Sequence, residues 1–289
     1  MSEEFVQHGV ILGQRPEDWV AGANTQIVYE VRNQSGDWRP YLPTKEIQFG
    51  KEDSMSCVSF SLINAIETQE KFLTGKETNY SDRWTAKRSG TTHEGNYLYK
   101  VADTVRKEGV VLDTSYSTPQ NYTFDEFHAD IPADKQAELE KEGKKWLERW
   151  DFKYEFIPLN LQAMLDHIKQ APLQIVIPGH AIVAFLCEQD IINYFDTYNP
   201  FEKKTAFSNL QAVLKPVLTL KQPKPMYEKV VKKDGTTFGV RISTPNGDQI
   251  IYATGEEQWR SWSKPDSYGL NTVNSDGSSN FTDCIQLPW

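Results

Sequence analysis

The pattern of apolar residues changes once along this chain, near Pro172, and the change limits the folds open to it. Before it, apolar side chains recur at the spacing of amphipathic helices, over residues 57–73, 97–108, 133–150 and the segment after Asn160. After it come short apolar or alternating runs typical of strands, at residues 173–177, 180–187 and 191–196. Helices followed by strands favour an α+β fold, with a helical half packed on an antiparallel β half.

A proline-containing linker is expected to divide the chain into two parts. The 289 residues suffice for one large domain and a small module. Residues 221–225 contain two prolines, which stiffen a linker. Beyond it, Asp234-Gly235 and Asn246-Gly247 are strong hairpin signals. We expect a main domain over residues 1–220, begun by an extended arm over 1–45, and a small β-rich module over 226–289.

Composition and charge exclude several classes of protein. The net charge of −9 argues against a nucleic-acid partner, which a basic patch would mark. The longest apolar runs, such as residues 181–187, are too short to cross a bilayer, so no membrane partner is expected. The first residues show no secretory signal, which predicts a cytoplasmic protein. Cys57, Cys187 and Cys284 have no metal-ligand or disulfide spacing, so we expect no metal and no cofactor.

Cys57 stands at the predicted start of a long helix. Ser56 is suited to cap the helix with its side chain, and Gly75 follows its end. Unpaired N–H groups and the helix dipole stabilise a thiolate at such a position. A lone cysteine is most often a small core residue. The placement of three further polar residues makes a nucleophile the better interpretation here.

Those residues are His180, Asp196 and Gln48. His180 begins one strand and Asp196 ends the next, so the two ends of the hairpin meet, as a base and its orienting group must. Tyr198 follows two residues later and is expected to shield this pair from water. Gln48 is the only Gln or Asn between Gln34 and Cys57. Its amide and the Cys57 backbone N–H are therefore expected to form an oxyanion hole.

These segments resemble the papain-like cysteine peptidases. Residues 57–61, Cys-Val-Ser-Phe-Ser, resemble the Cys-Trp-Ala-Phe-Ser helix start of that family. Residues 180–183 resemble its His-Ala strand, and Gln48 its oxyanion-hole glutamine. Residues 196–198, Asp-Thr-Tyr, resemble its Asn-Ser-Trp segment. The closest pattern is a divergent type found in bacteriophage and uncultured-bacterial sequences, which would allow association with a virion if the protein is phage-encoded.

The resemblance implies a papain-like fold, with a long central helix that begins at the cysteine, and a thiol endopeptidase acting on peptides or proteins. Residues 90–96 resemble the loop of the family whose backbone pairs with an extended substrate. The implied substrate contacts are therefore Gly95, Asn96, Gly179 and Tyr198.

Two departures from the family pattern leave alternatives open. The third catalytic position holds Asp196 rather than Asn, and Asn199 lies close enough to be the true member. Gln48 lies nine residues before Cys57, three more than in papain, so a loop insertion has to bring it back. Two functions other than a thiol endopeptidase also fit the sequence. One is an acyl transferase of the transglutaminase or cell-wall-amidase type, and the other is a non-catalytic structural protein of a phage particle. The module over 226–289 suits binding or anchoring, in a structural protein and in a tethered peptidase alike.

Overall fold

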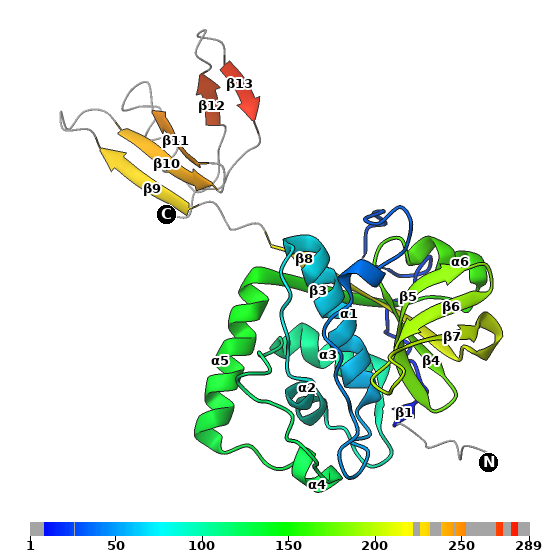
Figure 1. The fold of residues 1–289 in the computed structure, drawn as a ribbon. Coiled ribbons are helices and arrows are strands. Elements are labelled where there is room, and N and C mark those ends of the chain that lie inside the picture. The colour runs from blue at the N-terminus through cyan, green and yellow to red at the C-terminus, as the bar shows by residue number, and fades with distance from the viewer. Residues whose placement is uncertain are drawn as a thin grey trace, which may run out of the picture. The chain divides into compact units, whose positions relative to one another are not determined.

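The computed structural model describes residues 9–25 and 27–221, and the backbone of five strands beyond them. The chain divides into two compact units, Met1–Lys221 and Gln222–Trp289 (Figure 1), and each is described by itself. Among the described residues, no helix combines the length and the apolar character needed to span a membrane. Residues 222–225 of the predicted linker and Cys284 lie outside the described residues.

The second unit contains two small antiparallel sheets. One has the order β11-β10-β9 and is formed by β9 (Met226–Val231), β10 (Phe238–Thr244) and β11 (Gly247–Tyr252). The other pairs β12 (Leu270–Val273) with β13 (Ser279–Thr282). The predicted turn residues Asp234, Gly235 and Asn246 lie outside the described residues. A binding or anchoring role for this unit stays a prediction.

The first unit has a helical half and a sheet half. Its helices are α1 (Cys57–Thr74), α2 (Asp82–Ser89), α3 (Leu98–Glu108), α4 (Phe124–Phe127), α5 (Ala133–Arg149) and α6 (Leu161–His167). Its main sheet is formed by β3 (Trp150–Phe156), β4 (Leu173–Ile177), β5 (His180–Glu188), β6 (Ile191–Phe195), β7 (Glu202–Ala206) and β8 (Ala212–Leu220). The six strands are antiparallel in the order β3-β8-β4-β5-β6-β7. This architecture confirms the predicted α+β class.

The α1 helix runs through the middle of the unit, between α2, α3 and α5 on one side and strands β4–β7 on the other (Figure 1). Its residues from Cys57 to Glu70 are all buried. Leu62 and Ile66 pack in a cluster with α3, whereas Ala65 joins the cluster of the sheet. Burial on both faces explains why its apolar stripe is so wide, and it fixes the position of Cys57 relative to the sheet.

One local prediction was wrong, and one predicted helix was a single residue too long. Ser56 stands at the N-cap of α1, but its hydroxyl donates to the carbonyl of Ser54 at 2.9 Å and makes no capping bond. The predicted helix over 133–150 ends at Arg149, because Trp150 begins β3, pairs with Leu220 and is buried. Gly75 does follow α1 in the left-handed conformation expected of a helix end, with φ of 69°.

The N-terminal arm is fixed to the sheet half by Trp38. The indole is fully buried and donates to the carbonyl of Ile168 at 2.6 Å. Near its start, β1 (Val10–Ile11) pairs in parallel with β2 (Asn96–Tyr97). The arm therefore crosses from the helical half to the sheet half, and its first described residues lie beside the segment that precedes α3.

Candidate active site

Cys57 is the first residue of α1, and its side chain is fully buried. The backbone N–H of Ala181, at the start of β5, points to its sulfur, with an N–S distance of 3.4 Å. Burial raises the pKa of the thiol well above its usual range, and the nearby Asp53 and Asp196 raise it further. The N–H groups of Ala181 and Val58 act in the opposite direction. In this arrangement the effect of burial exceeds that of the two N–H groups and favours the neutral thiol.

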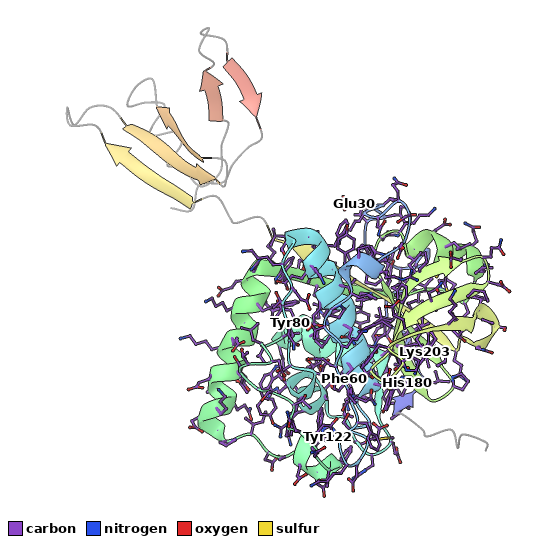
Figure 2. All side chains as sticks on the ribbon, in the orientation of Figure 1. Glu30, Phe60, Tyr80, Tyr122, His180 and Lys203 are labelled. Carbon is purple, nitrogen blue, oxygen red and sulfur yellow. The ribbon has the colours of Figure 1, made fainter. Side chains whose placement is uncertain are left out.

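His180 is the first residue of β5, directly before Ala181, and is 4% exposed. Its Nε2 lies 2.7 Å from Oδ1 of Asp196, just after β6, so the hairpin brings the two residues together. Asp196 also accepts from Lys203 Nζ at 2.7 Å, on the same side of the molecule as His180 (Figure 2). Burial raises the pKa of Asp196, but the bonds to His180 and Lys203 outweigh it and leave the pKa below its usual value.

Tyr198 lies beside this pair. Its ring packs edge-on against the imidazole of His180, with centroids 5.5 Å apart, which suits the predicted shielding. Its hydroxyl donates to Asp53 Oδ2 at 2.6 Å, across to the loop before Cys57. Asn199, the alternative third member, is exposed in the following turn, whereas Asp196 bonds to His180 directly. Gly179 lies in the turn before His180, with a positive φ of 76°.

Gln48 is fully buried and lies close to the same hairpin. Its Oε1 accepts from the hydroxyl of Thr197 at 2.9 Å, and its Nε2 donates to Asp53 Oδ1 at 2.9 Å. The added loop residues fold back on themselves, because Phe49 bridges to Asp53 and the N–H of Ser54 donates to the Gln48 carbonyl. This turn accommodates the longer spacing between Gln48 and Cys57. Sequence reasoning did not identify Asp53.

Gly95 and Asn96, assigned by resemblance to substrate, contact the chain's own arm. The N–H of Asn96 donates to the carbonyl of Gly9 at 2.9 Å. A Cβ at Gly95 would lie 1.7 Å from that carbonyl oxygen, so only glycine allows this approach. The side-chain amide of Asn96 is buried and donates to Ser89 and Thr91. The backbone of this segment is therefore covered, and the Asn96 side chain holds its own loop.

The arm also lies against the loop that leads to Cys57. A Cβ at Gly9 would lie 2.3 Å from the carbonyl oxygen of Met55, two residues before the thiol. The next residue, Val10, is 8% exposed and belongs to the same buried cluster as Cys57 and Ala181. The first described residues of the arm thus lie against the loop before Cys57 and share a buried cluster with the thiol.

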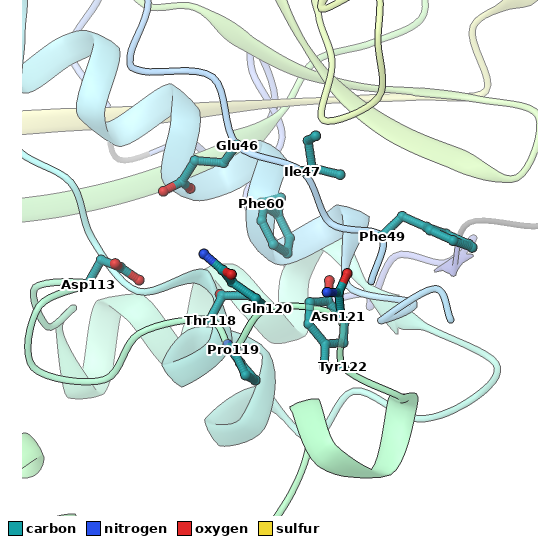
Figure 3. A pocket seen from close by; sticks show the side chains of 10 residues that line it. All are labelled: Glu46, Ile47, Phe49, Phe60, Asp113, Thr118, Pro119, Gln120, Asn121 and Tyr122. Atoms are coloured by element: carbon teal, nitrogen blue, oxygen red, sulfur yellow. The ribbon is translucent and has the colours of Figure 1, made fainter. Parts of the chain in front are cut away.

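A cavity of about 360 Å³ lies behind the Gln48 loop (Figure 3). It is bounded by the side chains of Glu46, Ile47 and Phe49 on one side and by Phe60 of α1 and the loop over 118–122 on the other. Tyr122 lines the cavity, and its hydroxyl donates to the backbone carbonyl of Gln48. The Gln48 loop is therefore supported from behind by a chain segment far away in sequence.

A second group of carboxylates lies along the helical side of α1. Burial raises the pKa of Asp82, and neighbouring Glu46 and Glu67 raise it further. Burial likewise raises the pKa of Glu67, although the N–H of Tyr80 lowers it. Among the described residues, Asp82 Oδ1 and Glu46 Oε2 are buried with no donor group of another residue, and a hydrogen bond between the two carboxyls is one of the causes that raise the pKa of Asp82. Within that same part of the chain, no three His, Cys, Asp or Glu side chains are grouped as metal ligands.

This chain is similar to solved structures, but the comparisons by sequence found no match. No family model and no curated protein matches this chain. A Carica candamarcensis cysteine protease solved with E-64 is 17% identical, with a TM-score of 0.46, over 63% of this chain and 96% of that one. Procathepsin L 3 of Tenebrio molitor is 14% identical, with a TM-score of 0.48, over 66% and 73% of the two chains. Bromelain of Ananas comosus, solved with the E64 inhibitor, is 12% identical, with a TM-score of 0.45, over 63% and 97%.

Proposed function

We propose that this chain is a cysteine peptidase in which Cys57 is the nucleophile and His180 the base. The observation that carries the proposal is the contact between the Cys57 sulfur and the N–H of Ala181. This contact brings the residue next to His180 to the thiol, and Asp196 forms a hydrogen bond with the imidazole of His180. These two contacts support the assignment of nucleophile, base and orienting group to a helix and a hairpin more than 120 residues apart.

The hydrogen bonds assign a role to each ring nitrogen of His180. A carboxylate only accepts hydrogen bonds, so Nε2 carries the hydrogen shared with Asp196. Nδ1 is then the nitrogen that takes the proton of the Cys57 thiol. The thiolate attacks the peptide carbonyl carbon, and His180 gives the proton to the departing amine as the C–N bond breaks. Water, deprotonated by His180, then cleaves the thioester and restores the thiol.

The negative oxygen formed in each step needs hydrogen-bond donors. The backbone N–H of Cys57 is one, since the first N–H groups of a helix have no partner within it. The amide of Gln48 is the other, held beside the hairpin by Thr197. Loss of one such donor lowers kcat by about 100- to 1000-fold in a well-studied hydrolase.

An extended substrate along Gly95 and Asn96 has to displace the arm. Replacing Val10 by Asp puts a charge into the apolar cluster that contains Cys57, so the arm should dissociate from the site. We expect peptide hydrolysis to rise about tenfold, the change that corresponds to about 1.4 kcal/mol. The matched control is Leu12→Asp, because Leu12 lies on the same arm but is 52% exposed. Equal rates in the two variants would show that the arm does not limit access.

Full burial of Cys57 also favours a second candidate, a non-catalytic protein with the same architecture. Hydrolysis of a mixed fluorogenic peptide library separates the two. The peptidase predicts turnover by the wild type, faster turnover by Val10→Asp, and none when Cys57→Ser is added to Val10→Asp. Absence of turnover in the folded Val10→Asp protein would favour the non-catalytic candidate.

A further inference from the structure

Asp53 connects the two halves of the site. It lies in the loop between Gln48 and Cys57, and its carboxylate accepts from both sides. Oδ1 accepts from Gln48 Nε2 at 2.9 Å and from the N–H of Met55 at 2.8 Å. Oδ2 accepts from the Tyr198 hydroxyl at 2.6 Å, and Tyr198 packs on His180. One carboxylate therefore joins the oxyanion loop to the His180 hairpin.

The bond to Asp53 determines which way the Gln48 amide faces. A side-chain amide can turn over, which exchanges its oxygen and its nitrogen. A carboxylate accepts only, so the amide nitrogen has to face Asp53, and the amide oxygen then faces the hydroxyl of Thr197. Of the two hydrogens on Gln48 Nε2, one is used by Asp53. The second hydrogen on Gln48 Nε2 lies in the same amide plane, so its direction is fixed by the bond to Asp53 as well.

We propose that Asp53 is a positioning residue that orients the Gln48 amide for the oxyanion and ties its loop to the His180 hairpin through Tyr198. This inference rests on the proposed peptidase function. It adds to the nucleophile, the base, the orienting group and the oxyanion amide a fifth side chain, which positions the site through its bonds to Gln48 and Tyr198.

The charge of Asp53 has a second, opposite effect. After burial, it is the first of the charges that raise the pKa of the Cys57 thiol. The same carboxylate that orients the oxyanion donor therefore disfavours the thiolate. Removing its charge should lower the pH at which Cys57 is alkylated and at the same time lower kcat. A purely structural role does not predict these opposite changes.

The test compares three variants of the full chain by peptide turnover and by the pH midpoint of Cys57 alkylation with iodoacetamide. Asp53→Asn leaves a single acceptor oxygen, which cannot serve both Gln48 Nε2 and the Tyr198 hydroxyl, so kcat should fall about 10-fold, with KM within about twofold, short of the loss of a whole oxyanion donor. Its alkylation midpoint should move to lower pH. Asp53→Glu keeps the charge but displaces the oxygens, so only kcat should fall.

Glu52→Gln is the matched control, since Glu52 is a neighbouring exposed carboxylate that accepts from the N–H of Phe124. Glu52→Gln should change neither kcat nor the pH midpoint of Cys57 alkylation. Wild-type kcat in Asp53→Asn and Asp53→Glu would overturn the role of Asp53 alone. If Asp53→Asn does not fold, Asp53→Glu alone decides through its kcat. A wild type without turnover, even with Val10→Asp added, would overturn the peptidase proposal and this inference together.

Discussion

Two groups of carboxylates flank α1, and their pKa values are shifted in opposite directions. At the N-terminal end of the helix, Asp196 accepts from His180, Lys203 and the N–H of Thr197, and its pKa is lowered. Along the helical side, Asp82 and Glu67 are also buried, but their pKa values are raised. Burial is common to both groups, so the number and charge of the donors decide which carboxylates stay ionised.

Negative charge has different effects in the two groups. In the first it holds the imidazole of His180, and in the second it lowers the stability of the fold. The donors around Asp196 come from the hairpin and from β7, and they hold an anion beside His180. The group of Asp82, Glu67 and Glu46 gathers acceptors instead, and among the described residues no donor group of another residue reaches Asp82 Oδ1. Substitutions in the first group should therefore change activity, and those in the second should change stability.

The largest expected effect comes from breaking the first group at Asp196. Asp196→Ala removes the acceptor that holds Nε2 of His180, and we expect peptide turnover to fall about 100-fold or more. Asp196→Asn keeps an acceptor oxygen for Nε2, so its turnover should stay within about tenfold of wild type. Steady-state kinetics of both variants measure the difference. Equal losses in the two would contradict the role of orientation and favour that of charge.

A smaller effect, on stability, is expected from Asp82→Asn in the second group. The amide supplies a donor towards Glu46 and removes a charge from a buried site. We expect the free energy of unfolding at neutral pH to rise by about 1–3 kcal/mol, the cost of a buried unsatisfied polar group. Urea denaturation measures it, and Asp125→Asn, at an exposed position of α4, is the control. A loss of stability would mean that the Asp82 charge is compensated in the native state.

The smallest expected effect is a change with pH in the stability that Asp82→Asn gains over the wild type. Asp82 has a raised pKa in the folded state, so its contribution to stability is present below the unfolded pKa of about 3.9 and is lost as pH rises through the folded pKa. The advantage of Asp82→Asn should therefore be small near pH 4 and grow towards neutral pH. Asp196, with a lowered pKa, behaves in the opposite way and loses its contribution as pH falls. A pH-independent advantage would contradict the assignment to titration of Asp82.

The helix that begins at Cys57 and the hairpin that joins His180 to Asp196 could be predicted, because each depends on local spacing. Ser56 shows the limit of such rules, since it stands at the N-cap but its hydroxyl oxygen accepts from no N–H of the helix. Asp53 could not be identified in this way, because its bond to Tyr198 joins segments that are 145 residues apart in the sequence.

The position of the N-terminal arm beside the site could not be predicted either, because tertiary contacts bring Gly9 and Gly95 together. The group of Glu46, Glu67 and Asp82 is likewise formed by three segments that are separate along the chain.

The proposal that Cys57 is the nucleophile of a peptidase is checked by the intact mass of the protein after incubation with a peptidyl epoxide. The account predicts a single adduct on the wild type, faster formation of that adduct on Val10→Asp, and none once Cys57→Ser is introduced. No adduct on Val10→Asp, in a protein whose Cys57 a small alkylating reagent does reach, would contradict it.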